Sequence, residues 1–168
     1  MAIGARYKVP FRRRRAGKTN YHYRLRLLRS GMTRAVVRKT NSKLIIQFVD
    51  YSPQGDLVRV HATSAELKKF GWTSSLTNCS AAYLTGVMAG KRAISKNIDS
   101  AVLDIGLSTP VKGSNIFSLL KGMVDAGVLI PHSDEVLPDE ERVSGAMNNN
   151  DNVKKEFETV KKNIEEKG

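Results

Sequence analysis

Cationic and aromatic side chains alternate over the first quarter of this chain of 168 residues. Half of its 28 Lys and Arg residues lie within residues 1–49, and the first carboxylate along the chain is Asp50. Guanidinium groups bind phosphates through paired hydrogen bonds, and aromatic rings stack on unpaired bases. This combination indicates an RNA partner more specifically than positive charge alone would.

The candidate RNA-binding residues of this region are its cations and the rings between them. The cations are Arg6, Lys8, Arg12, Arg13, Arg14, Arg15, Lys18, Arg24, Arg26, Arg29, Arg34, Arg38, Lys39 and Lys43, and the rings are Tyr7, Phe11, Tyr21, His22 and Tyr23. For Phe11 and Tyr23, ordinary packing is an equally good interpretation. A solvated role is a poorer one for residues 12–15, because four adjacent like charges destabilise a chain without an anionic partner.

Catalytic chemistry has little support elsewhere in the sequence. A nuclease with a ribonuclease H-like core is the rival hypothesis, but residues 78–95, expected to form its main helix, contain no Asp or Glu that could hold a divalent metal. Asp104 is therefore expected to be a capped or solvent-facing strand residue. The three His residues are far apart, and the lone Cys79 has no partner for a disulfide or a zinc site. We expect no enzyme, no cofactor, no metal and no small-molecule substrate.

The composition predicts one globular domain with appendages. The formal net charge is +12, but residues 50–168 contain all 16 carboxylates and are close to neutral. No apolar run approaches the roughly 18 residues that a membrane span needs, and the positive N-terminus lacks the apolar stretch of a secretory signal. We therefore expect a cytoplasmic protein that does not bind membranes.

Residues 1–19 form a basic arm, expected to be disordered in isolation because it has little to bury. A helix is predicted over residues 21–30, with Asn20 as its N-cap and Gly31 after its end. Helical periodicity places Tyr21, Leu25 and Leu28 on its inward face. His22, Arg26 and Arg29 lie on the opposite, basic face.

Residues 20–132 are expected to form the globular α/β domain. Strands are predicted at residues 34–40, 44–50 and 56–62, joined by turn-prone segments into an antiparallel meander. A short helix follows to Phe70, with a capping box at Thr63 and Glu66. A helix at 78–95, a strand at 101–106, a helix at 114–126 and a short strand at 128–130 complete a mixed sheet backed by helices. This order resembles the ribonuclease H-like layout.

The long helix contains a row of small residues, Ala82, Gly86 and Gly90, spaced four apart. We attribute the row to close packing of the helix on the sheet, with close approach of RNA as the less favoured alternative.

Residues 133–168 form an acidic, helical C-terminal extension. A short helix is expected at 138–145, a break at 148–150 and a last helix from Asp151. That helix has a narrow apolar seam of Val153, Phe157, Val160 and Ile164, which suits docking on one neighbouring surface. The sequence leaves open whether that surface belongs to the same chain.

Several long segments resemble a known family. They are YKVPFRRRRAGKTNYHYRLRLLRSG, RKTNSKLIIQF, AYLTGVMAGKRA, AVLDIGL and GVLIPHSDEV. Together they are similar to the archaeal form of the universal 5S-rRNA-binding protein family of the large ribosomal subunit, number eighteen in the large-subunit series. The resemblance extends from about Arg6 to Asp139 and does not cover the last helix.

The resemblance implies a structural protein of the large ribosomal subunit without catalytic activity. It would hold 5S rRNA against the large-subunit (23S-type) rRNA in the central protuberance, beside ribosomal protein number five. The implied RNA contacts are the arm from Arg6 to Lys18 with Thr19, the helix at Tyr21, His22, Arg24, Arg26 and Arg29, and the strand turn at Arg38, Lys39, Asn41 and Lys43. One Lys is inserted relative to the bacterial Arg-Ser-Asn-Lys motif, so the role of Lys39 is less defined than that of Arg38.

Overall fold

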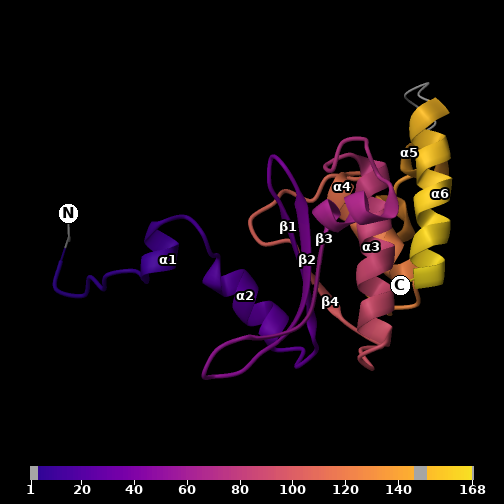
Figure 1. Ribbon diagram of the computed structural model, residues 1–168. Coiled ribbons are helices and arrows are strands. Elements are labelled where there is room, and N and C mark those ends of the chain that lie inside the picture. Colours follow the sequence, from indigo (N-terminus) through magenta and orange to yellow (C-terminus); the bar gives the residue numbers. More distant parts are fainter. Residues whose placement is uncertain (1–3, 146–150, 168) are drawn as a thin grey trace.

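The computed structural model describes residues 4–145 and 151–167, and its centre is a four-stranded mixed sheet (Figure 1). The strands are β1 (Arg34–Lys39), β2 (Leu44–Asp50), β3 (Leu57–Thr63) and β4 (Val102–Asp104), in the order β3-β2-β1-β4. β1, β2 and β3 pair antiparallel, and β4 pairs parallel to β1. The predicted α/β class with a mixed sheet is confirmed.

The meander follows from alternation of side chains along its strands. Ala35 and Val37 of β1, together with Ile46 and Phe48 of β2, are completely buried on the helix-covered face. Val37 lies opposite Ile46 in the antiparallel register, so their apolar side chains share that face.

Helices α3 (Cys79–Ile94) and α4 (Asn115–Asp125) cover one face of the sheet (Figure 1). They cross so closely that a Cβ on Gly86 would lie 2.3 Å from the carbonyl oxygen of Leu119, and one on Gly122 would meet the carbonyl of Tyr83 at 2.2 Å. The prediction that the small residues allow close packing is confirmed, but the predicted partner, the sheet, is wrong. Gly86 and Gly90 face α4, and not the sheet, because the helix pair needs the closest backbone approach.

Two predicted elements differ in type. The segment after the meander is a 3-10 helix, η1 (Ser64–Phe70), in which the Glu66 carboxylate accepts the backbone N–H of Thr63 as expected for a capping box. The predicted strand at 128–130 is reduced to one parallel bridge between Ser100 and Leu129. It stops there because Pro131 has no N–H to extend the pairing.

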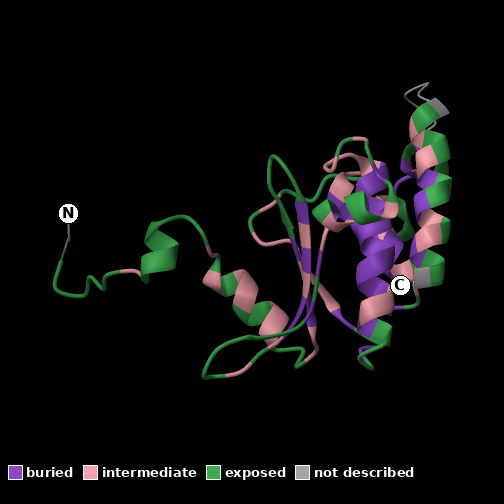
Figure 2. Ribbon diagram, in the orientation of Figure 1, coloured by how far each residue is buried: buried purple, intermediate pink, exposed green. Residues whose placement is uncertain are grey.

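The C-terminal extension contains η2 (Asp134–Val136), α5 (Glu140–Ser144) and α6 (Asp151–Lys167). The predicted break at 148–150 lies outside the described residues. α6 packs on α3, η1 and α5, which settles that its neighbour belongs to the same chain. Phe157, Val160 and Ile164 of the predicted seam are buried, as Figure 2 shows for the inner side of this helix.

The N-terminal region contains α1 (Arg12–Arg15) and α2 (Tyr21–Leu28). The segment expected to be disordered thus includes one helical turn, closed by the bonds of Arg15 and Ala16 to the carbonyls of Phe11 and Arg12. All four arginines of α1 are exposed (Figure 2). α2 begins at the predicted cap, where the Asn20 side chain accepts the N–H of Tyr23.

The inward face of α2 differs from the prediction at one of three positions. Tyr21 and Leu28 are half-buried as predicted, but Leu25 is 53% exposed, and Arg24 and Leu27 are half-buried as well. The reason is an ion pair between Arg24 and Asp56, which rotates the helix so that Arg24 faces the body. His22, Arg26 and Arg29 are exposed, as predicted for the basic face.

Candidate nucleic-acid interface

A groove of about 850 Å³ lies where the arm and α2 meet the sheet. Its walls come from the arm end, α2, the end of β1, the β2–β3 loop and the segment after β4. It brings together seven residues that the sequence predicts to contact RNA: Arg13, Lys18, Thr19, Tyr21, Arg24, Arg38 and Lys39. These cations and rings are separated by up to 26 positions in the chain and share one concave surface.

The sequence reasoning missed several residues that line the groove. They are Tyr51, residues of the loop around Pro53, Asp56 and Asp104. Tyr23, one of the predicted rings, also lines the groove but is not among the contacts that the resemblance implies. Tyr51 could have been found as an aromatic residue at a Pro-Gly turn, which is an exposed place for a large ring. Asp56 and Asp104 could not have been found from the sequence, because acidic residues are not expected in a site that binds a polyanion.

The arm continues the basic surface beyond the groove. Phe11 is 71% exposed and Tyr7 49% exposed. The Phe11 ring lies 5.2 Å from that of Tyr21, tilted by 54°, so the two rings connect the arm to α2. Arg13 donates from Nε to the Thr19 hydroxyl at 2.8 Å, a contact that fixes the chain between α1 and α2.

The predicted strand turn is formed and exposed. Thr40 bonds Lys43 through its backbone N–H at 2.9 Å and through its hydroxyl at 2.8 Å, closing the turn between β1 and β2. Lys39, Asn41 and Lys43 are exposed around it. Of these, only Lys39 lines the groove; Asn41 and Lys43 extend the surface along the hairpin.

The remaining predicted residues divide by exposure. Arg6, Lys8, Arg12, Arg14, Arg15, His22, Arg26 and Arg29 are exposed outside the groove lining. Arg34 differs from all of them, because its side chain is 3% exposed and bonded on both sides by carboxylates. Its placement gives no support to a direct RNA contact and instead makes it part of the sheet.

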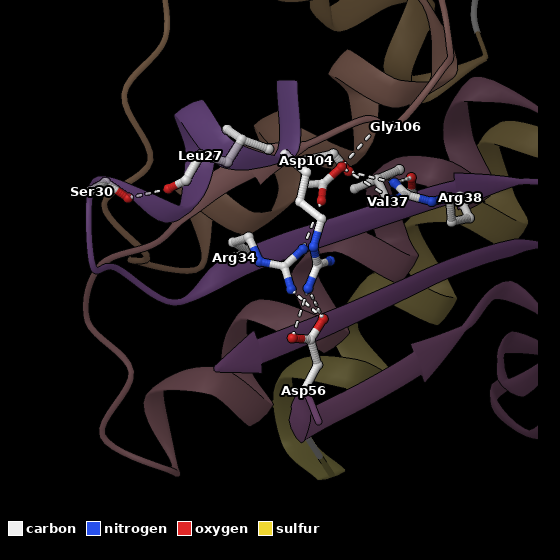
Figure 3. Close-up of polar contacts among 9 residues, drawn as sticks. Leu27, Ser30, Arg34, Val37, Arg38, Asp56, Asp104 and Gly106 are labelled. Carbon is white, nitrogen blue, oxygen red and sulfur yellow. Dashed lines mark hydrogen bonds and ion pairs between the residues drawn. The ribbon is translucent and has the colours of Figure 1, made fainter. Parts of the chain in front are cut away.

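Figure 3 shows the ion-pair network around Arg34. Its Nη2 lies 2.6 Å from Asp56, and its Nη1 lies 3.0 Å from Asp104. Asp104 is 5% exposed, so the expectation of a solvent-facing side chain is wrong, whereas the alternative of a capping side chain agrees with its bond to the backbone N–H of Gly106. The carboxylate tolerates burial because two guanidiniums and the backbone N–H of Gly106 satisfy its oxygens.

Arg38 is held in one orientation by the same carboxylate. Its Nη1 donates to the backbone carbonyls of Val37 at 2.7 Å and Asp104 at 2.8 Å, and its Nη2 to the Asp104 side chain at 3.1 Å. Gly106 lies against the guanidinium, where a Cβ would be 2.9 Å from Cζ. The Arg38 side chain is still 44% exposed, so a fixed planar cation faces the groove.

Two groups in the groove have shifted pKa values. Partial burial acts to raise the pKa of Asp56, but hydrogen bonds and charge from Arg24 and Arg34 outweigh it and lower the pKa below its ordinary value. Burial raises the pKa of Tyr23, and the Asp104 charge raises it further. Asp56 is therefore ionised and Tyr23 neutral near neutral pH, so Tyr23 offers a hydroxyl and a ring without negative charge.

The arrangement suits a phosphate backbone with unpaired bases. Fixed guanidiniums can bind phosphate oxygens, and Tyr21, Tyr23 and Tyr51 offer rings for stacking. In residues 4–145 and 151–167, no group of three or more His, Cys, Asp or Glu side chains gathers to hold a metal ion. Across the same residues, no helix is long and apolar enough to cross a membrane.

Comparison with known proteins gives an independent result. The chain matches the family described as "Ribosomal large subunit proteins 60S L5, and 50S L18" over residues 5–101 and 96–133. Three relatives are each named "Large ribosomal subunit protein uL18". That of Aeropyrum pernix is 56% identical over 85% of this chain and 67% of its own length. That of Natronomonas pharaonis is 52% identical over 87% and 79%, and that of Methanobrevibacter smithii 50% over 86% and 75%.

Proposed function

Since the chain belongs to the family of ribosomal large subunit proteins 60S L5 and 50S L18, we propose that it binds 5S rRNA through the groove and the β1–β2 hairpin, and large-subunit rRNA through the extended arm. It is a structural constituent of the large ribosomal subunit, an rRNA-binding ribonucleoprotein component that serves translation in the cytoplasm. The choice of RNA and the contact surface are the proposed part.

The observation that carries the proposal is the convergence of predicted residues on one groove. Arg13, Lys18 and Thr19 from the arm, Tyr21 and Arg24 from α2, and Arg38 and Lys39 from β1 line it together. Charge, aromatic rings and the family resemblance predict these residues as RNA contacts, and they come from three separate parts of the fold. Their assembly on one concave surface supports a single RNA site.

Two rRNA partners suit the two parts of the surface. The groove is built on the sheet, whereas α1 extends away from the body (Figure 1). We assign 5S rRNA to the groove and the hairpin. The extended arm, with its exposed arginines at 12–15, reaches large-subunit rRNA, so that the protein anchors one RNA to the other in the central protuberance. Ribosomal protein number five is the proposed protein neighbour, as the resemblance implies.

A non-enzymatic role fits the carboxylates of the fold. The strand order and the parallel pairing of β4 with β1 support the ribonuclease H-like layout that the sequence predicts. However, α3 contains no Asp or Glu, and the Asp104 carboxylate is engaged by Arg34 and Arg38. A metal-dependent nuclease would need such carboxylates free to bind metal ions.

Competition binding tests the proposed RNA. The intact protein should prefer labelled 5S rRNA over tRNA and duplex DNA at moderate salt. Equal affinity for the three would overturn the proposal, as would turnover of RNA by the protein in Mg²⁺. Footprinting of 5S rRNA with and without residues 1–19 would then locate the arm: its removal should leave the protection by the hairpin and the sheet side of the groove in place and lose only the protection next to Arg13, Lys18 and Thr19.

A further inference from the structure

Two carboxylates lie among the cations of the groove (Figure 3). Asp56 accepts hydrogen bonds from Arg24 and Arg34, and Asp104 accepts them from Arg34 and Arg38. The groups form a chain of alternating charge from α2 across the sheet to the end of β4. Every negative charge in a site for a polyanion weakens its attraction for phosphate. These two carboxylates therefore need a role that offsets that effect.

The geometry at Asp56 leaves most of the Arg24 guanidinium available. Nη2 of Arg24 lies 2.9 Å from both carboxylate oxygens of Asp56. In the described part of the chain this is the only side-chain group that Arg24 bonds, so the hydrogens on Nε and Nη1 are left for another acceptor. The Arg24 side chain is 31% exposed and lines the groove. Asp56 thus fixes one edge of the guanidinium and leaves the other edge for phosphate.

Asp56 is itself anchored to the rigid sheet. It accepts Nη2 of Arg34 at 2.6 Å, and Arg34 is held from its other side by the buried Asp104. The position of Arg24, and of the helix that carries it, is therefore set through three groups that are in place without RNA. Ordering side chains before binding removes an entropic cost from the association step.

We propose that Asp56 is a positioning residue for RNA binding, which holds the guanidinium of Arg24 and the helix α2 at the rim of the groove. This inference rests on the proposed function, because the RNA concerned is the one bound in that groove. Beyond the proposed function, the inference means that an acidic residue strengthens the binding of a polyanion. The effect acts through Arg24 and not through contact of Asp56 with RNA.

Asp56→Asn gives a test whose sign decides between two roles. The substitution removes a negative charge, so a residue that acts only through its charge would bind 5S rRNA more tightly when replaced. A positioning residue gives the opposite result, a loss of affinity of about threefold or more, as expected for coupled polar pairs. Glu135→Gln is the matched control, because it makes the same charge change in an exposed pair with Lys112 outside the groove lining and should cause no loss.

A double-mutant cycle separates positioning from a general loss of structure. In an Arg24→Gln background, Asp56→Asn should cause little further loss of affinity, because the residue it positions is gone. Thermal unfolding of each variant checks folding, and Asp56→Glu, which keeps the carboxylate, should recover part of the affinity. Unchanged or tighter binding by Asp56→Asn, or an equal loss in the Arg24→Gln background, overturns the inference. Failure of the wild-type protein to prefer 5S rRNA over tRNA would instead overturn the proposed function.

Discussion

Lys91 of α3 caps the end of α6: its Nζ lies 3.0 Å from the carbonyl oxygen of Ile164 and 2.8 Å from that of Glu165. Carbonyls in the last turn of a helix have no partners within the helix, so an ammonium group placed there satisfies them and complements the helix dipole. At the same turn, the Ile164 side chain is completely buried in the core. The last helix is therefore attached to the body by both polar and apolar contacts.

Ile164→Ala should lower the free energy of unfolding by about 2–5 kcal/mol, because it removes a fully buried aliphatic side chain and leaves a cavity. Chemical denaturation measures the change. Lys162→Ala, an exposed substitution on the same helix, should stay within about 0.5 kcal/mol of the wild type. The folded Ile164→Ala protein should keep its RNA affinity, since α6 lies on the side of the sheet away from α2 (Figure 1). A matching loss of RNA affinity would assign α6 to the RNA surface.

Acid should weaken the attachment of α6 through Glu156. Hydrogen bonds from Thr73 and Ser74 lower the pKa of Glu156 below its ordinary value of 4.5, against a smaller opposing effect of burial. A group whose pKa is lower in the folded state stabilises that state above its unfolded pKa, and this contribution is lost as the pH falls through the folded value. The free energy of unfolding should thus fall less between about pH 5 and pH 3 for Glu156→Gln than for the wild type. An equal fall in the two proteins would exclude this contribution of Glu156.

Replacing Arg12, Arg13, Arg14 and Arg15 together by Gln should weaken RNA binding and reduce its salt dependence. If all four contact phosphates, the slope of log affinity against log salt should become shallower by about three. The control replaces Lys69, Lys154, Lys155 and Lys162, four exposed cations on η1 and α6, and changes the net charge equally. Equal effects of the two sets would show that net charge governs binding and that the arm has no special place in it.

Gly86→Ala should destabilise the protein by about 1–3 kcal/mol or more, because the added Cβ would lie 2.3 Å from a backbone carbonyl of α4. The two helices would have to separate. Lys155→Ala, on an exposed helical position, serves as the control and should change little. Thermal unfolding of both variants measures the difference, and a neutral Gly86→Ala would contradict the tight crossing.

The sequence predicted most of the elements because their patterns are local. Alternation of apolar residues marks β1 and β2, and Asn20 caps α2 where the sequence places it. The orientation of α2 was not predictable in this way, because the Arg24 partner, Asp56, lies on another element 32 positions later. The periodicity that favoured Leu25 as an inward residue contains no information on such a pair.

The same limit applies to the groove. The cations and rings of its predicted wall could be chosen from composition, since polyanion binding requires them. Arg34 is the same residue type as the exposed arginines and cannot be distinguished from them in the sequence. Only the fold shows the difference, because it places Arg34 beside Asp104, 70 positions later. Burial of a charge depends on tertiary pairing, and a single sequence shows the two partners only as separate charged residues.

The pairing of Arg34 with Asp104 also sets an order of events during synthesis. A chain made from its N-terminus can form the β1–β2–β3 hairpins from local contacts, but β4 and its carboxylate leave the exit tunnel 70 residues after Arg34. Until then the nascent meander has a guanidinium on its surface that the finished protein buries. The arm and α2 are made before β4, so the groove between them and the sheet is complete only after β4 has joined β1.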